Sequence, residues 1–239
     1  MATRTDAGRK LRPADDYHKF YSRHADRYAS NQVERVQRVW TRSSHPLLEG
    51  NHSLIDSLVE MAPGPRGLDA GCGAGAIDVA ELVKRGLDVT GIDAVEENVE
   101  TALRIHPFLE DRVRVGDLSR RLQFPDDSFD FVMCNAVIQH LSERRVYRTT
   151  LHELSRITRP GGVLQLVFKS GHGTVTVHDP DYDEIRSFQL FDERRVLTVL
   201  QSQGMDLVPA EDETSLGGLM YFINNNDLRH CALWARKIV

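Results

Sequence analysis

The chain has 239 residues, of which 41% are hydrophobic and 27% charged, and its formal net charge at pH 7 is −5. This composition is that of a globular protein built as one long domain, or as one domain with an appended cap. The net negative charge argues against nucleic acid as the main partner, and no segment reaches the ~18 apolar residues of a membrane helix, so no membrane partner is expected.

The first predicted elements are helices within residues 14–60, which precede the first strand and form an N-terminal helical cap or lid over residues 1–62. Residues 1–42 hold ten Lys or Arg against five Asp or Glu. That excess fits either a solvated basic helix face or a basic flap that closes over an acidic cofactor cleft. In the stretch YHKFYSRHADRYA, Tyr17 and Tyr21 stand one helical turn apart, so they are expected to share a face.

From residue 63 onward the chain alternates short apolar runs with helical patterns. Strands are expected at 67–70, 87–93, 112–117, 129–137, 163–169, 205–211 and 230–239. Helices are expected at 76–86, 95–106, 142–158 and 191–205. Such alternation implies right-handed βαβ units. The fold class is therefore α/β, a Rossmann-like, seven-stranded, mainly parallel sheet with helices on both faces.

Two segments near the C-terminus depart from this alternation. Residues 170–193 are polar and irregular, so they are expected to form an insertion over the strand ends that caps the substrate. The connection between the last two strands is short for a helical crossover, so these strands are expected to pair antiparallel.

The stretch from Leu68 to Asp93 carries the strongest functional signal. Gly71, Gly73 and Gly75 follow a strand and lead into a helix, an arrangement that brings the backbone close to a ligand. Asp93 ends the next strand, where its carboxylate could accept both hydrogen bonds of a ribose diol. The segment also satisfies the dinucleotide pattern G-x-G-x-x-A. However, Asp69 inside the turn repels a pyrophosphate and suits a cofactor that carries an ammonium group.

With Asp117 ending the third strand and Pro160-Gly161-Gly162 preceding a later one, the sequence resembles the class I S-adenosylmethionine-dependent methyltransferases of the small-molecule group, from about Leu68 to the C-terminus. Their D/E-x-G-x-G-x-G signature stands here as residues 69–75. The resemblance implies that the cofactor is S-adenosyl-L-methionine, that the product is S-adenosyl-L-homocysteine, and that residues 63–239 form the cofactor-binding domain. The contacts it implies are Asp69, Gly71, Cys72 and Gly73 for the methionine part, Asp93 with Ala94 for the ribose, Asp117 with Leu118 for the adenine, and Asn135 with Ala136 for the sulfonium side.

His140, just after the fourth long strand, is the candidate general base, because an imidazole titrates near neutral pH. The alternative is a histidine that caps a helix or packs over the adenosine. Some phosphobase methyltransferases pair such a histidine with an N-terminal tyrosine that latches a lid. Candidate substrate contacts are Tyr17, Tyr21, Tyr28, Trp40, Lys169, His172 and Tyr221. No metal site is expected, because the His and Asp residues at 172–181 lack a recognised ligand pattern.

The expected activity is methyl transfer to an oxygen or nitrogen atom of a small-molecule acceptor, with a role in specialised metabolism suggested by the cap. The alternatives are methylation at carbon, a protein of this fold that binds the cofactor without transferring its methyl group, and an NAD-linked oxidoreductase. The sequence NAVI where nucleic-acid methyltransferases carry NPPY argues against that class. Three scattered cysteines favour a reducing compartment, so the expected location is cytoplasmic. The oligomeric state cannot be read from the sequence.

Overall fold

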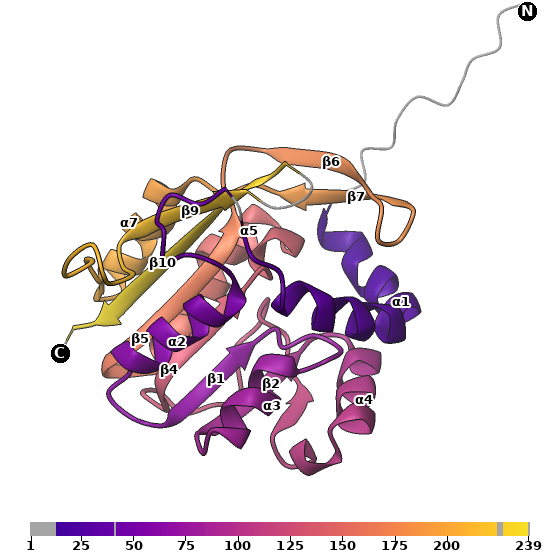
Figure 1. Cartoon of the computed structure of the whole chain (residues 1–239), viewed down its shortest axis with the longest axis horizontal. Helices are drawn as coiled ribbons and strands as arrows, with labels where there is room; N and C mark the ends of the chain where they lie inside the picture. Colours follow the sequence, from indigo (N-terminus) through magenta and orange to yellow (C-terminus); the bar gives the residue numbers. More distant parts are fainter. Residues whose placement is uncertain (1–12, 41, 224–226, 239) are drawn as a thin grey trace, which may run out of the picture.

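The computed structural model of the chain describes residues 13–40, 42–223 and 227–238 (Figure 1). Two helices come first, α1 (Pro13–Val36) and α2 (Asn51–Met61). Helix α1 bends at His24, where φ is −116° and ψ is 15°. Within the described ranges, no helix has the length and apolar character needed to cross a membrane.

The central sheet has the strand order β3-β2-β1-β4-β5-β10-β8. Its parallel strands are β1 (Arg66–Ala70), β2 (Asp88–Asp93), β3 (Val113–Val115), β4 (Phe129–Asn135) and β5 (Thr158–Lys169). Strand β10 (Arg229–Lys237) runs antiparallel to both β5 and β8 (Met205–Leu207). The seven-stranded, mainly parallel sheet and its antiparallel last pair are therefore confirmed.

The connection between β8 and β10 contains one further strand, β9 (Leu219–Ile223), which was not expected. It pairs antiparallel with Arg229–Leu233 of β10, whereas β8 pairs with Ala235–Lys237. The two short strands thus share one edge of β10, and the connection needs no helix.

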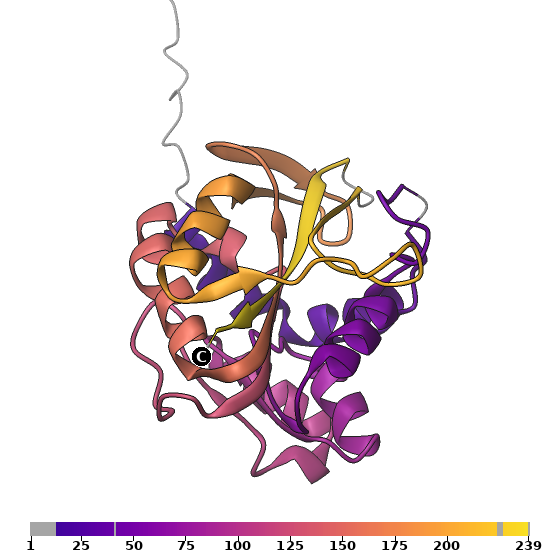
Figure 2. The same cartoon turned by 90° about the vertical axis from the view of Figure 1, so that its left-hand side faces the viewer.

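Helices cover both faces of the sheet, as Figure 2 shows. One layer holds α2, α3 (Ile77–Lys84) and α4 (Glu96–Ile105), and the other holds α5 (Glu143–Arg145), α6 (Leu151–Ile157) and α7 (Glu193–Ser202). A π-helical turn, Val146–Thr150, separates α5 from α6 within the single helix expected there. In β4, Phe131 and Met133 pack towards the first layer, and Val132 and Cys134 towards the second. Because both faces of β4 are buried, its residues 131–134 are all apolar.

Residues 170–193 are not irregular, as the sequence suggested, but contain a β-hairpin of β6 (Thr174–Asp179) and β7 (Glu184–Gln189). The hairpin lies beside α1 in Figure 1, and β7 contacts α1 directly. Glu184 accepts hydrogen bonds from Nε2 of His24 (2.9 Å) and from Arg23 (3.1 Å) on α1. These strands are polar because they pair with each other at the surface instead of burying a full face, and this is why the sequence pattern missed them.

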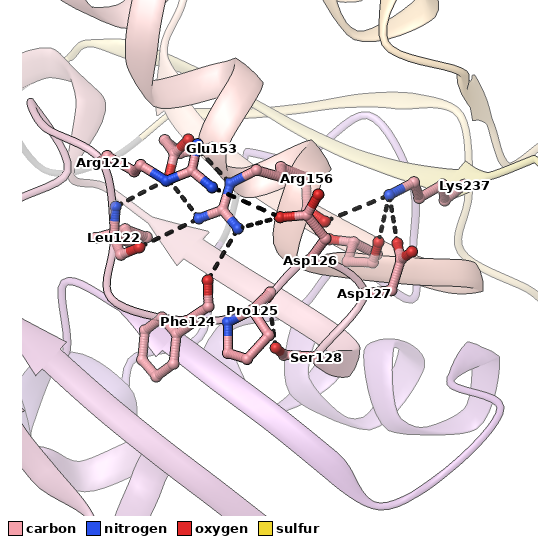
Figure 3. Close-up of polar contacts among 11 residues, drawn as sticks. Arg121, Leu122, Phe124, Pro125, Asp126, Asp127, Ser128, Glu153, Arg156 and Lys237 are labelled. Carbon is pink, nitrogen blue, oxygen red and sulfur yellow. Dashed lines mark hydrogen bonds and ion pairs between the residues drawn. The ribbon is translucent and has the colours of Figure 1, made fainter.

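Arg156 of α6 fastens the loop that leads into the amino end of β4 (Figure 3). Its guanidinium donates to the carbonyl oxygens of Leu122 (3.2 Å) and Phe124 (2.9 Å). It also pairs with Asp126 (2.7 Å) and Glu153 (2.6 Å). This cluster lies at the opposite end of β4 from Asn135, so its role is structural.

Candidate functional site

The glycine loop after β1 requires residues without side chains. Gly71 and Gly73 have φ values of 108° and 68°, in the left-handed region. A Cβ atom on Gly71 would lie 2.3 Å from Cγ2 of Val137. The loop therefore passes directly under the segment that follows β4, and only glycine permits that approach.

The backbone N–H groups of this loop are already used by the chain itself. Gly73 N donates to Oδ2 of Asp93 at 3.0 Å, and Gly75 N donates to Oε1 of Gln32 on α1 at 2.6 Å. A loop that cradles phosphates leaves such donors free for the ligand. The arrangement therefore argues against a pyrophosphate ligand. The sequence offered no signal for Gln32.

Asp93 ends β2 with its carboxylate facing a cavity at the carboxyl ends of the strands. Its Oδ1 accepts from Val95 N (2.9 Å) and from Nδ2 of Asn98 (3.1 Å). Burial raises the pKa of Asp93, while these hydrogen bonds lower it. A carboxylate has about four lone-pair positions, so Asp93 can accept further hydrogen bonds from a ligand.

That first cavity lies between the strand ends and α1, and most residues predicted to bind the cofactor line it. They are Asp93, Ala94, Asp117, Leu118, Asn135 and Ala136, with Tyr17, Tyr21 and Tyr28 of α1 opposite them. Burial, and then the charges of Asp117 and Asp93, raise the pKa of Tyr17 to about 12. Tyr17 is therefore a neutral hydrogen-bonding group at any ordinary pH.

A second cavity opens from the first towards β5, the hairpin and β9. Both cavities are lined by Tyr21, Tyr28, Gly71, Asn135, Ala136 and His140. Asp69, Cys72, Trp40 and Lys169 line the second cavity only. The structure does not bring His172 or Tyr221 to either cavity, and the side chain of His172 is 83% exposed.

Asp69, the acidic residue of the glycine motif, is 5% exposed. No described residue donates a hydrogen bond to its carboxylate. Burial raises its pKa well above the usual range, and the charges of Asp78 and Asp93 add to that effect. A buried carboxylate without donors is unfavourable, and a cationic ligand group in the second cavity would relieve it.

His140 lies in the short 3₁₀ turn Ile138–His140, where the cap meets the strand ends. Its Nε2 lies 3.2 Å from the hydroxyl oxygen of Tyr21, and Arg186 of β7 donates to that oxygen at 2.6 Å. The guanidinium can only donate, so the Tyr21 oxygen accepts from Arg186, and in the His140 tautomer with an unprotonated Nε2 the Tyr21 hydroxyl donates to that nitrogen. Burial, together with the charges of Arg186 and Lys169, holds the pKa of His140 well below its usual value. The imidazole is therefore neutral.

Arg186 connects the hairpin to α1 and was not foreseen, because its segment was expected to be irregular. It forms an ion pair of 2.8 Å with Asp179, and both side chains are buried. The guanidinium also lies over the ring of Phe20 at 4.2 Å and that of Phe188 at 4.9 Å. These contacts hold the hydroxyl of Tyr21 in its place between the cap and His140.

The far end of the second cavity has an aromatic wall and one buried ammonium group. Trp40 stacks on Phe222 at 3.7 Å, and Phe222 stacks on His230 at 4.8 Å. The Nζ of Lys169 lies 3.0 Å from Nε2 of His230, and burial lowers the pKa of His230 to about 3. Since that imidazole is neutral, Nε2 accepts and Lys169 donates.

Comparison with known proteins agrees with this geometry. Residues 68–166 match the family described as a methyltransferase domain. The resemblance to the class I S-adenosylmethionine-dependent methyltransferases is confirmed for this segment. S-Adenosylmethionine is the cofactor of that class. It has no phosphate groups, so it does not need the N–H donors of the glycine loop, which Asp93 and Gln32 already occupy. A dinucleotide would need them.

Three relatives illustrate the range of the similarity. Phosphoethanolamine N-methyltransferase 3 of Arabidopsis thaliana is 28% identical over 192 residues, covering 78% of this chain and 38% of that protein. The 27-O-demethylrifamycin SV methyltransferase of Amycolatopsis mediterranei is 32% identical over 140 residues, covering 53% and 48%. The crystal structure of the [4+2]-cyclase SpnF superposes with a TM-score of 0.64 at 17% identity, covering 98% of this chain and all of that one. The chain thus spans less than half the length of these two curated relatives, and the likeness to the cyclase concerns the fold.

Proposed function

We propose that the protein transfers the methyl group of S-adenosylmethionine to an oxygen or nitrogen atom of a small metabolite. The observation that carries this proposal is the junction of the two cavities. Asn135, Ala136 and His140 line both of them. A cofactor in the first cavity would therefore present its reactive end to an acceptor in the second, as transfer between two bound molecules requires.

The cofactor would be held in a fixed orientation, with its adenosine in the first cavity and its methionine part in the adjoining part of the second. Asp93 would accept from the ribose hydroxyls, and Asp117 with Leu118 would bracket the adenine. Asp69 would face the ammonium group of the methionine part, which accounts for a buried carboxylate without donors. The bound cofactor supplies an electrophilic methyl group on a positively charged sulfur.

His140 would receive the proton that the acceptor loses. With Tyr21 in its observed position, the proton would reach Nε2 through the Tyr21 hydroxyl, which gives its own proton to His140 and takes the acceptor's in exchange. Arg186 would stabilise the oxygen of Tyr21 during this exchange. In the balance of the reaction, the methyl–sulfur bond breaks, the methyl–acceptor bond forms, and the positive charge passes from sulfur to the imidazole. The charge of the buried site therefore stays constant.

The second cavity would select the acceptor. Its aromatic wall of Trp40 and Phe222 suits a planar or apolar body, and the ammonium group of Lys169 suits a polar substituent. Two of the relatives are an N-methyltransferase and a methyltransferase for an O-demethylated compound, and a nitrogen or oxygen acceptor is in keeping with these two.

The test is formation of S-adenosylhomocysteine by the purified chain. The protein would be incubated with S-adenosylmethionine and a panel of phenols, alcohols and amines, with mass spectrometry of both products. Product formation that needs both the chain and one acceptor supports the proposal. Tight cofactor binding without turnover on any acceptor would contradict it and would favour the second candidate.

The second candidate is a protein of this fold that holds the cofactor without using its methyl group. The superposition on a [4+2]-cyclase along nearly the whole of both chains favours it. In that case Asp93 and Asp69 would keep their roles, while the second cavity would promote another reaction of a bound metabolite. The two candidate functions can be separated by replacing S-adenosylmethionine with S-adenosylhomocysteine, which has no methyl group to transfer. A cyclase incubated with its substrate would remain active under these conditions, whereas a methyltransferase would not.

A further inference from the structure

A buried carboxamide oxygen lies beside the junction of the two cavities and has no donor. Gln139 belongs to the 3₁₀ turn Ile138–His140 and lines the second cavity. The residue is 2% exposed, and within the part of the chain that the structure describes no group donates a hydrogen bond to its Oε1. Burying such an oxygen is unfavourable unless a bound molecule supplies the donor.

The turn after β4 fixes the orientation of this carboxamide. Ala136 has a φ of 59°, in the left-handed region that a residue with a Cβ atom rarely adopts. Its N–H donates to the carbonyl oxygen of Val167 in β5 at 2.7 Å, and its own carbonyl oxygen accepts from Nε2 of Gln139 at 2.8 Å. Because a carbonyl oxygen can only accept, the amide nitrogen of Gln139 points to Ala136 and Oε1 is the unused end.

The neighbouring carboxamide, that of Asn135, leaves the opposite end unused. The indole Nε1 of Trp234 can only donate, and it donates to Oε1 of Gln165 at 2.8 Å. Nε2 of Gln165 therefore donates to Oδ1 of Asn135 at 3.1 Å. Nδ2 of Asn135 is left without a partner among the described residues. The unused amide oxygen at this place is therefore that of Gln139.

The reacting atom of the acceptor must match both Tyr21 and Gln139. In the proposed reaction the Tyr21 hydroxyl takes one proton from that atom. A hydroxyl acceptor has a single hydrogen, so it would leave Oε1 of Gln139 unpaired. A neutral primary amine has two N–H groups and a lone pair, which can face Tyr21, Gln139 and the methyl group respectively.

We propose that Gln139 selects a primary amino group as the methyl acceptor, by accepting one of its N–H groups at Oε1. The inference rests on the proposed function, because it places the acceptor in the second cavity. The lone pair of the nitrogen forms the bond to the methyl carbon, and the carbon–sulfur bond breaks with its electrons passing to sulfur. One N–H proton passes through Tyr21 to Nε2 of His140, while the other N–H stays bonded to Gln139.

The first test needs only the unmodified protein and matched aromatic probes: aniline, N-methylaniline and phenol, with the naphthalene equivalents of all three. Arylamines are neutral at the pH of the assay and suit the aromatic wall of the cavity. Formation of S-adenosylhomocysteine gives kcat/KM for each probe. The primary amine should exceed both the hydroxyl compound and the N-methylated amine by about tenfold or more, because each of these has a single hydrogen on the reacting atom. The reaction should therefore stop after one methylation.

Gln139→Met keeps the length of the side chain and removes Oε1. It should lower kcat/KM for the primary amine by about tenfold or more and change that for the hydroxyl compound by less than about twofold. Gln201→Met is the matched control, because Gln201 is exposed on α7 and lines neither cavity. It should leave every value unchanged.

Equal losses for the amine and the hydroxyl compound in Gln139→Met would overturn the proposal, since they would mean that Gln139 only supports the turn at Ala136. An unchanged preference for the amine would overturn it as well. If the variant does not fold, the unmodified protein still decides, because equal methylation of primary and N-methylated amines contradicts the proposal. Methylation of hydroxyl compounds alone would overturn this inference and leave the proposed function standing. Methylation of no probe would contradict both.

Discussion

Asp93→Asn should weaken binding of S-adenosylhomocysteine by about 1.5–3 kcal/mol, which is roughly 10- to 150-fold in Kd. The carboxylate is held by N–H donors of Gly73, Val95 and Asn98, which leaves about one of its four lone-pair positions for a ribose hydroxyl. An Asn side chain keeps one oxygen and places an NH₂ group against N–H donors of the chain. The variant therefore loses the negative charge and at least one acceptor.

The assay is titration calorimetry with S-adenosylhomocysteine and with its 2′,3′-dideoxy analogue, on the unmodified protein and the variant. If Asp93 binds the ribose, removing the diol should weaken binding to the unmodified protein by about as much free energy as the substitution does. The variant, which has already lost that interaction, should bind the two ligands with nearly equal affinity. Asp88→Asn is the control, because Asp88 begins the same strand and pairs with Arg112 at the surface. Equal sensitivity of both proteins to the loss of the diol would refute the ribose assignment.

Three further predictions concern His140 and Arg156. Once an acceptor is known, His140→Ala should lower turnover by about 10²–10⁴-fold with cofactor affinity nearly unchanged; lost cofactor binding would instead assign it to packing over the adenosine. Burial and nearby cations depress the pKa of His140 in the folded state. The free energy of unfolding is therefore unaffected by His140 titration above about pH 6.5 and decreases as the pH falls below it, because only the unfolded chain binds the proton. Below that pH the free energy of unfolding of the unmodified protein should fall more steeply than that of His140→Phe, by up to about 1.4 kcal/mol per pH unit. Urea melts at pH 7.5, 6 and 5 in which both proteins lose stability equally would contradict this. Arg156→Met should destabilise the fold by about 2–4 kcal/mol, because it leaves two carbonyl groups without this donor and removes the cation paired with Glu153, whose carboxylate keeps the N–H of Leu122. The exposed Arg120 provides the control substitution, and an equal effect of Arg120→Met in the same melts would contradict the prediction.

The sequence alone determined the sheet and the position of the glycine loop. Strands buried on both faces are apolar along most of their length, as β4 is at residues 131–134, and this signal does not depend on what packs against them. The glycine loop was equally readable, because positive φ values and the approach of Val137 restrict those positions to glycine. Asp93 followed from the same pattern, since the end of β2 must lie beside the loop in a parallel sheet.

Only the tertiary structure decided how the cap, the hairpin and the strand ends meet. Strand β6 alternates Thr and Val at residues 174–177, but this run is short and the rest of the hairpin is polar and half-exposed, so the alternation by which longer strands are recognised is weak. Arg186 therefore could not be placed beside Tyr21 and His140, although the tyrosine and the histidine were both candidates. In the same way, Asp78 resembled an ordinary acidic residue in the first turn of a helix. Its hydrogen bond of 2.8 Å with Asn51 joins α3 to α2, a contact between separate segments that local pattern does not encode.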